Sequence, residues 1–529
     1  MSRPLARLRA RIRRLSGLPL LIALALAGAG GVLAHAPYFI QPALAAALVM
    51  LVLALDGARR SRRPLVSGFA RAWAFAFGMF LAGAWWVANA FANNPNPAYH
   101  WMGPIAALLL AAGLALLWGM AGAGYARLSR PGVHRIAVFA VVIFAIEMTR
   151  TYALSGFPWN LPGHVWPAGG AVSQVASLIG ASGLSFLTLY AFASPAALIA
   201  RASLAARLIP VLAGAALLAA AGAFGAVRLA DASAGPLEGG RLRVVQAEVP
   251  PLEKTYENRR AILRQYLEMS LEPGLEGVDA VVWPEVAIPA YLQSEPDLIE
   301  AMSAAFDGGP LLITGAARFE RGPDETAYYN SLFVIDFAGG QAASLGVYDK
   351  TRLVPFGEGN PVRALTERFG FTALARNFFT PGSGAATLAP GAMPAFAPLI
   401  CYEVIFPRFV PRGEMRPAFL LNVSNDSWYG DSAGPRQHLN QARYRSIEEG
   451  LSMARAASGG SSGLIDPWGR GVALLPLGAE ETLDIQVLEG LDETLYGKHG
   501  DTPWVSAGFI LLFAVHLVVA FVNRRAIHV

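Results

Sequence analysis

The sequence predicts a polytopic α-helical membrane domain of about eight spans, joined to a layered α/β domain. Three observations predict this fold class. Hydrophobic residues make up 54% of the 529 residues and charged residues only 15%, whereas about 25% charged is usual for a soluble domain. Apolar segments follow one another from Ser16 to about Arg228. From Leu229 to Asp501 the chain changes to shorter β-like and helix-like runs that carry more charge.

The first part of the chain, 1–228, contains seven apolar segments that we expect to be transmembrane helices, since a span takes roughly 20 residues. They are centred near Leu26, Leu48, Phe80, Leu110, Val141, Leu187 and Ala215. The last part, 502–529, predicts an eighth transmembrane helix over 505–522 and a cytoplasmic tail. The first segment is expected to remain uncleaved, because further spans follow it directly.

Arginines alternate between the connections of these segments. "SRPLARLRARIRR" at the N-terminus and "GARRSRRP" in the second connection are basic, whereas "ANNPNPAYHW" in the third contains no Lys or Arg. Positive residues favour the cytoplasmic side, so both termini are predicted to be cytoplasmic and 229–501 to lie outside the cytoplasm. The net charge of +5 does not indicate nucleic-acid binding, because many basic residues stand in short clusters between apolar segments.

The part between the seventh and eighth spans, 229–501, interleaves predicted strands and helices. Strands are expected at 241–249, 278–285, 310–319 and 417–426, and a hairpin at 331–340 and 342–350. Helices are expected at 259–272 and 435–450, the second of them amphipathic. This alternation favours a layered α/β domain with a parallel or mixed sheet.

Three chemically complementary residues stand at the ends of predicted strands. Glu285 ends "VDAVVWPE", Lys350 ends "LGVYDK", and Cys401, the only cysteine, ends "FAPLIC". In open α/β sheets ligands gather at the carboxyl ends of strands. A thiolate is a nucleophile, a carboxylate can take its proton, and an ammonium can stabilise an oxyanion. The three residues therefore predict a site for nucleophilic catalysis.

Each of the three also has a simpler interpretation when it is taken alone. Cys401 is compatible with a small buried apolar residue, Glu285 with a loop carboxylate, and Lys350 with an exposed charge. A single cysteine excludes an internal disulfide framework and a multi-cysteine zinc site. The eight histidines show no metal-binding spacing, so no metal site is expected.

Four segments, "WPEVAIP", "YDKTRLVPFGE", "ICYE" and "NVSNDSWYGDSAGPRQH", occur in this order. They resemble the carbon–nitrogen hydrolase (nitrilase) superfamily. Such a domain between seven preceding spans and one following span, with "SGFPWN" before the sixth, resembles the apolipoprotein N-acyltransferase family. The resemblance implies an αββα sandwich for 229–501, acting as a periplasmic nitrilase-like catalytic domain. It also implies a multi-pass protein of the bacterial inner membrane.

The resemblance further implies a role for each matching residue. Glu285 matches the general base, Lys350 the transition-state lysine and Cys401 the nucleophile. Residues that match supporting positions are Glu358, Tyr402 and Glu403. The implied reaction moves an acyl chain from a phospholipid, typically phosphatidylethanolamine, to the N-terminal amine of a diacylglyceryl-cysteine apolipoprotein. It is a ping-pong reaction through a thioester on the cysteine and needs no cofactor.

Substrate contacts are expected at three further residues: Trp159, at the lipid access, and Asn425 and Trp428, in the pocket wall. Trp166 fits either lipid access or interfacial anchoring. Glu403 fits either support of Lys350 or the first turn of the following helix.

Asp426 fits a turn as well as the pocket wall, and a structural role is expected for His438. The sequence departs from the family pattern at Thr255, where an aromatic residue is common. It departs again around 458–463, where small residues favour a wider or more mobile pocket wall.

Two alternative functions are compatible with the sequence. In a membrane-tethered nitrilase-type amidase or hydrolase, water would accept the acyl group at the same catalytic residues. A transporter with an extracytoplasmic binding domain would need charged groups inside its spans. Glu147 is the main such residue, and it is expected to pair with Arg150.

Overall fold

The computed structural model describes residues 16–94, 96–153, 155–200, 202–323, 325–360, 379–413 and 415–502. The chain divides into two compact units. Unit 1 comprises 1–92, 98–231 and 498–529, and unit 2 comprises 93–97 and 232–497.

Unit 1 is built from helices in its described residues. Its α-helices are α2 (Gly17–Gly31), α3 (Gln41–Ala58), α4 (Pro64–Gly83), α5 (Val87–Ala92), α6 (Met102–Leu128), α7 (Arg135–Tyr152), α8 (Ala176–Ala193) and α9 (Leu204–Ala230). Short 3₁₀ helices connect them at η1 (Val32–Ala34), η2 (Pro97–Tyr99), η3 (Pro162–Val165), η4 (Val172–Val175) and η5 (Ser194–Ile199).

Six helical segments of the described chain are long and apolar enough to cross a membrane, which identifies a membrane protein. They are 17–34, 41–58, 64–83, 102–128, 172–199 and 204–230. They coincide with six of the seven segments predicted in 1–228. The remaining segment, the fifth in chain order, is helix α7. It is 18 residues long but contains Arg135, Glu147 and Arg150. The predicted eighth span, 505–522, lies outside the described residues.

Helices α2, α4 and α6 pack closely because small residues lie at their crossings. A Cβ atom on Gly28 of α2 would lie 1.9 Å from the carbonyl oxygen of Phe75 on α4. A Cβ atom on Gly68 of α4 would lie 2.4 Å from the carbonyl oxygen of Gly122 on α6. Close backbone approach through small residues is typical of membrane helices, where dispersion rather than the hydrophobic effect drives association.

Gly28→Leu is therefore expected to lower the thermal unfolding midpoint of the detergent-purified protein, because the side chain would force α2 away from α4. Overpacking of this kind costs about 1–3 kcal/mol. Gly30→Leu on the same helix is the matched control, since a Cβ there meets no atom of the described chain within 4 Å. Equal midpoints for the two variants would contradict the packing argument.

Two buried ionisable residues near the C-terminal end of α7 pair with each other. Glu147 and Arg150 on α7 form an ion pair with both side chains 1% exposed, as predicted. Trp118 Nε1 donates to Glu147 Oε1 at 2.8 Å, and Arg150 Nη1 donates to the carbonyl oxygen of Trp159 at 2.8 Å. The pair thereby ties α7 to α6 and to the "GFPWN" segment.

Unit 2 contains two β-sheets. The six-stranded sheet has the order β11-β1-β2-β3-β4-β5 and the five-stranded sheet the order β10-β9-β8-β7-β6. The first is made of β1 (Pro236–Gln246), β2 (Ala280–Val282), β3 (Leu311–Arg321), β4 (Thr326–Asp336), β5 (Ala343–Asp349) and β11 (Glu481–Leu488). The second is made of β6 (Phe396–Ile400), β7 (Phe419–Asn425), β8 (Met453–Ser458), β9 (Gly463–Ile465) and β10 (Gly471–Leu474).

Both sheets are mixed. Strands β1, β2 and β3 run parallel, and β4 and β5 continue antiparallel as the predicted hairpin. In the second sheet β6, β7 and β8 run parallel. The α-helices of this unit are α10 (Arg259–Ser270), α11 (Pro296–Phe306), α13 (Gly434–Glu449) and the short α14 (Leu495–His499) at its edge. Its 3₁₀ helices are η6 (Leu292–Ser294), η7 (Ala338–Gly340), η8 (Cys401–Ile405) and η9 (Asp426–Tyr429).

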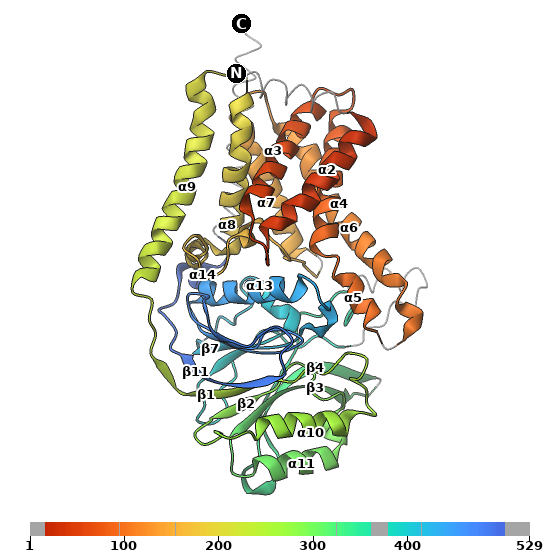
Figure 1. Cartoon of the computed structure of the whole chain (residues 1–529), viewed down its shortest axis with the longest axis vertical. Helices are drawn as coiled ribbons and strands as arrows, with labels where there is room; N and C mark the ends of the chain where they lie inside the picture. Colours follow the sequence, from red (N-terminus) through yellow and green to blue (C-terminus); the bar gives the residue numbers. More distant parts are fainter. Residues whose placement is uncertain are drawn as a thin grey trace. The chain divides into compact units, whose positions relative to one another are not determined.

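Alternating side chains build two cores from the six-stranded sheet. Val244 points into a cluster shared with Leu421 of β7, whereas its neighbour Val245 packs with Tyr266 of α10. This is the period of two expected for a strand. Figure 1 shows the resulting layers, with α10 and α11 outside the six-stranded sheet and α13 beside the five-stranded one. Cys401 belongs to the core between the sheets.

Helix α13 is where one predicted feature was wrong. It begins and ends close to the expected bounds but is not amphipathic, because polar as well as apolar residues along it are buried. Some of its buried polar groups have partners from other elements: Glu449 accepts from Arg412 Nη2 at 2.8 Å, and His438 contacts Asp426 at 2.9 Å. Hydropathy alone places such residues in solvent, because it does not register a partner from another element.

Candidate active site

Cys401 stands where strand β6 ends and the 3₁₀ helix η8 begins. Its φ is +48°, a left-handed conformation that is uncommon for a residue other than glycine and that often marks a functional site. The residue is 7% exposed. The sharp turn takes the chain out of the sheet directly at the thiol, so that the side chain lies at the strand's carboxyl end, as predicted.

Glu285 follows β2 at the carboxyl end of the other sheet. The segment lies directly against β3, where a Cβ on Gly315 would be 2.6 Å from the Cα of Glu285. This close approach explains the glycine in "ITGAAR". The next residue, Val286, has a φ of +42°, so the backbone turns sharply here as well.

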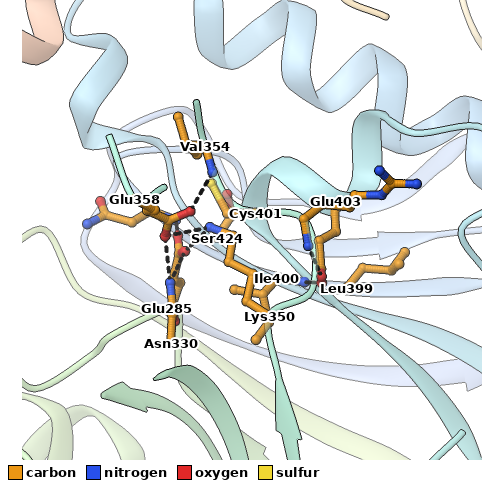
Figure 2. Close-up of polar contacts among 12 residues, drawn as sticks. Glu285, Asn330, Lys350, Val354, Glu358, Leu399, Ile400, Cys401, Glu403 and Ser424 are labelled. Atoms are coloured by element: carbon orange, nitrogen blue, oxygen red, sulfur yellow. Dashed lines mark hydrogen bonds and ion pairs between the residues drawn. The ribbon is translucent and has the colours of Figure 1, made fainter. Parts of the chain in front are cut away.

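Lys350 directly follows β5, and its ammonium group bridges two carboxylates. Nζ lies 2.8 Å from Glu285 Oε1 and 2.9 Å from Glu358 Oε1. Asn330 on β4 donates through Nδ2 to the same two oxygens, at 2.8 and 2.9 Å. Figure 2 shows these four residues, Glu285, Asn330, Lys350 and Glu358, beside Cys401. Lys350 is 1% exposed, which excludes its interpretation as an exposed charge.

Glu285 and Lys350 are held in their ionised forms. Burial raises the pKa of Glu285, but the charge and hydrogen bond of Lys350 and hydrogen bonds with Asn330 and Cys401 outweigh it, so the pKa is lowered. Burial lowers the pKa of Lys350, whereas the charges of Glu285 and Glu358 raise it well above its usual value. A carboxylate that can accept a proton therefore stands beside a permanent cation.

Cys401 rests as a thiol. Burial is the main cause that raises its pKa far above the usual value, and the negative charges of Glu285 and Asp426 add to it. The charge of Lys350 and a hydrogen bond with Ser424 act in the opposite direction. Because Glu285 lies close enough for its charge to act on the thiol, a proton acceptor is in place, and the thiolate need form only as the sulfur attacks.

Glu403 joins the strand of the nucleophile to the strand of the lysine. Its Oε2 accepts from the N–H of Ile400 at 2.8 Å, and its Oε1 accepts from the N–H of Thr351 at 2.6 Å and from the Tyr348 hydroxyl at 2.9 Å. Burial raises the pKa of Glu403 to about 7, although these backbone N–H groups favour the carboxylate. Both expected interpretations of Glu403 hold in part, because it lies in the first turn of η8 and also supports the backbone next to Lys350.

The remaining predicted residues lie in different places. Tyr402 is buried and packs edge-on against Phe406, with ring centroids 5.1 Å apart. Asn425 contacts Glu285 through its backbone, since its N–H donates to Oε2 at 3.0 Å. Trp428 on η9 is 38% exposed. These three belong to unit 2 with the catalytic candidates.

Trp159 belongs to unit 1. It is 2% exposed and packs against Trp86 and Phe157, with ring centroids 4.6 and 6.2 Å away. The predicted substrate contact of Trp159 stays a prediction.

The two departures from the family pattern lie in different surroundings. A Cβ on Gly459 would lie 2.5 Å from the Cα of Ser427, so the small residue fits a close approach rather than a wider wall. Next to Thr255, the Tyr256 hydroxyl donates to Glu295 at 2.7 Å.

Three contributors to this site were missed from the sequence. They are Asn330, Ser424 and Lys254, whose Nζ lies 3.5 Å from the carbonyl oxygen of Glu285. Burial lowers the pKa of Lys254 to about 8, against the charges of Glu285 and Glu248. A polar residue inside a strand, such as Asn330 in "YYNSLF", is the one local signal that could have drawn attention.

Across the described residues, no group of three or more His, Cys, Asp or Glu side chains has an arrangement that could hold a metal ion. The site brings together a thiol, a carboxylate and an ammonium group, which are groups that acyl transfer can use.

Known proteins match both parts of the chain. Residues 27–194 match the apolipoprotein N-acyltransferase N-terminal domain, and residues 241–493 match the carbon–nitrogen hydrolase family. An apolipoprotein N-acyltransferase of Rhodopseudomonas palustris is 36% identical over 515 residues, which cover 94% of each chain. Those of Caulobacter vibrioides and Bradyrhizobium diazoefficiens are each 37% identical, over 94% and 93% of this chain and 93% of the relative. With this identity over nearly the full length and the predicted catalytic residues gathered at one buried site, the chain belongs to the apolipoprotein N-acyltransferase family of enzymes.

Proposed function

We propose that this enzyme transfers an acyl chain from a phospholipid to the N-terminal amine of a diacylglyceryl-cysteine apolipoprotein, through a thioester on Cys401. The observation that carries the proposal is the buried ion pair of Lys350 with Glu285, both of whose charges act on the Cys401 thiol, in a chain whose described residues also include six membrane-length apolar helices. A soluble substrate would need no more than a single anchor. We expect the donor to be phosphatidylethanolamine.

In the first step the Cys401 sulfur attacks the ester carbonyl of the phospholipid while its proton moves to Glu285. A bond from sulfur to carbon forms, and the carbonyl oxygen takes the negative charge. Lys350 stabilises this oxyanion together with the backbone N–H of Tyr402. The ester C–O bond then breaks, and Glu285 returns the proton to the departing lysophospholipid.

In the second step the free α-amine of the apolipoprotein attacks the thioester. Glu285 takes a proton from the amine, the new C–N bond forms, and the C–S bond breaks while Glu285 passes the proton to the departing sulfur, which regenerates the thiol. The product is an amide, which is more stable than the thioester, so the step needs no further activation. Glu358 and Glu403 support the reaction indirectly, by holding Lys350 and the backbone around it.

Both substrates are held in a bilayer by their acyl chains, and each buried methylene is worth about 0.8 kcal/mol. The active site must therefore take the ester at the membrane surface. We place the catalytic domain, 229–501, on the periplasmic side of the bacterial inner membrane. Residues 1–228 would supply seven spans and 502–529 the eighth, with both termini in the cytoplasm. Trp159, Asn425 and Trp428 are proposed substrate contacts.

The proposal predicts a covalent acyl-enzyme intermediate that intact-mass spectrometry can detect. Purified protein mixed with phosphatidylethanolamine of one defined acyl composition is expected to gain the mass of one acyl group. The added mass should map to the peptide that contains Cys401 and be released by hydroxylamine, since thioesters are labile to it. A second sample with phosphatidylglycerol tests the headgroup preference.

Addition of a synthetic diacylated lipopeptide should then return the enzyme to its original mass and produce an N-acylated peptide. Release of free fatty acid without acylated peptide would favour the hydrolase alternative, in which water is the acceptor. If no acyl adduct formed with either phospholipid, the thioester mechanism would be wrong.

A further inference from the structure

Buried polar side chains surround the backbone that carries the nucleophile. We call them the Asp426 cluster: Asn422 and Ser424 on β7, Asp426 at the start of η9, His438 on α13, and Arg455 on β8. Each of the five is at most 1% exposed. Buried polar groups at this density are costly unless they bond to one another.

Asp426 lies at the centre of the cluster. Its Oδ1 accepts from the Ser424 hydroxyl at 2.6 Å and contacts His438 Nδ1 at 2.9 Å. Its Oδ2 accepts from Arg455 Nη2 at 2.6 Å. Burial alone would raise the pKa of Asp426, but the charge of Arg455 and the contact with His438 lower it below its usual range. The carboxylate therefore acts as an acceptor for all three neighbours.

Two sets of contacts connect the cluster to the backbone near the nucleophile, one at Leu399 and one at Cys401 itself. On one side Arg455 Nη1 donates to Asn422 Oδ1, and Asn422 Nδ2 donates to the carbonyl oxygen of Leu399 at 2.8 Å. The strand register explains this first set of contacts, because Leu399 pairs with Asn422 and Asn422 with Arg455 across three parallel strands.

On the other side His438 Nε2 lies 3.2 Å from the carbonyl oxygen of Cys401 itself. Both neighbouring oxygens can only accept, so the two contacts are both hydrogen bonds when each ring nitrogen carries a hydrogen, as in the imidazolium form. Asp426 at the opposite ring nitrogen fixes the orientation of the imidazole. The ring is thus held between the cluster and the peptide that follows the nucleophile.

That peptide has a particular importance for the chemistry. The Cys401 carbonyl and the Tyr402 N–H belong to one planar trans unit, in which they point in opposite directions. A donor that holds the oxygen therefore also sets the direction of the N–H. A hydrogen bond to the oxygen polarises the same unit and makes its N–H a stronger donor.

We propose that Asp426, His438 and Arg455 are positioning residues for acyl transfer. Through the Cys401 carbonyl, they hold the left-handed conformation of the nucleophile and aim the Tyr402 N–H at the oxyanion. This inference rests on the proposed function, because it assigns a purpose to the oxyanion donor assumed there. It gives His438 a role beyond the structural one that its sequence context suggests.

Three substitutions of His438 separate positioning from packing. In His438→Gln the amide nitrogen reaches the place of Nε2 and can donate to the Cys401 carbonyl. In His438→Asn the shorter amide reaches only the place of Nδ1, next to Asp426. His438→Ala removes both contacts. The measurement is the rate of acyl-enzyme formation at saturating phosphatidylethanolamine, followed by intact mass.

The Asn and Ala variants are expected to react about 10- to 100-fold more slowly, somewhat less than the loss of an oxyanion donor itself. The Gln variant should retain most of the rate. The donor concentration at half-saturation should stay unchanged in all three. Alkylation of Cys401 by iodoacetamide, which uses no oxyanion donor, should change much less than acylation.

Arg443→Gln is the matched control. Arg443 lies on the same helix and its Nε donates to the carbonyl oxygen of Gly469 at 2.7 Å, so the variant loses a comparable bond that does not reach Cys401. Its acylation rate should equal that of the wild type. If the His438 variants do not fold, Asp426→Asn, which is nearly equal in size, should show the same selective loss of acylation over alkylation.

This inference would be overturned if the Gln and Asn variants lost the same share of the acylation rate, or if acylation and alkylation slowed equally. A wild type that forms the acyl-enzyme would still support the proposed function in either case. A wild type that forms no thioester would instead overturn the proposed function.

Discussion

Cys401→Ala is expected to remove both the acyl-enzyme and the N-acylated product, with a loss of activity of more than about a thousandfold. The sulfur is the group to which the acyl chain becomes attached, and no other cysteine exists in the chain to replace it. The measurement is product formation with phosphatidylethanolamine and a diacylated lipopeptide, combined with intact mass of the protein.

The same variant is expected to remain folded. Cys401 is a small residue in the core between the sheets, and its truncation should cost about 1 kcal/mol, within the range of ordinary core substitutions. Alanine also meets the same backbone strain at a φ of +48°. An unfolding midpoint close to that of the wild type is the control, and full activity in a folded Cys401→Ala protein would show that another group is the nucleophile.

Glu285→Gln is expected to produce two effects of opposite direction. Loss of the general base should slow acyl transfer by about 10²- to 10⁴-fold. At the same time the thiol should become more acidic, because the charge of Glu285 raises the pKa of Cys401 while Lys350 lowers it. The pH profile of iodoacetamide alkylation should therefore shift to lower pH, so that the thiol alkylates faster at a given pH while the enzyme transfers acyl groups more slowly.

Glu358→Gln provides the comparison for this pair of measurements. Glu358 shares the Lys350 ammonium at 2.9 Å, but it is not among the largest causes that shift the pKa of Cys401. Its effect on the alkylation profile should accordingly be smaller. An alkylation profile that moves to higher pH in Glu285→Gln would contradict the assignment of Glu285 as the charge that suppresses the thiolate.

The catalytic candidates could be located from the sequence because each follows a strand with a clear local pattern. "AVVW" and "FAPLI" are continuous apolar runs, which is typical of buried parallel strands. Chain topology then brings their carboxyl ends together, so Glu285, Lys350 and Cys401 could be grouped without knowledge of any contact. The membrane helices could also be predicted from the sequence, since the length and hydropathy of a segment are local properties.

Long-range polar pairing could not be predicted in this way. Asn330 and Glu285 are 45 positions apart, and Arg455 and Asp426 are 29 apart. Nothing in "YYNSLF" or "MARAAS" indicates which partner a buried amide or guanidinium will meet. For the same reason helix α13 was expected to show a solvated face, although many of its polar residues are buried and some, such as His438, have partners from other elements.

The isolation of the nucleophile has a consequence for redox chemistry. If an oxidant reaches Cys401 and converts it to the sulfenic acid, the chain offers no second thiol with which to form a disulfide and so restore the sulfur. Recovery would depend on a reductant supplied from outside the protein, and further oxidation to the sulfinic acid would be permanent. The acyl group of the thioester, by occupying the sulfur, would protect the enzyme between its two half-reactions.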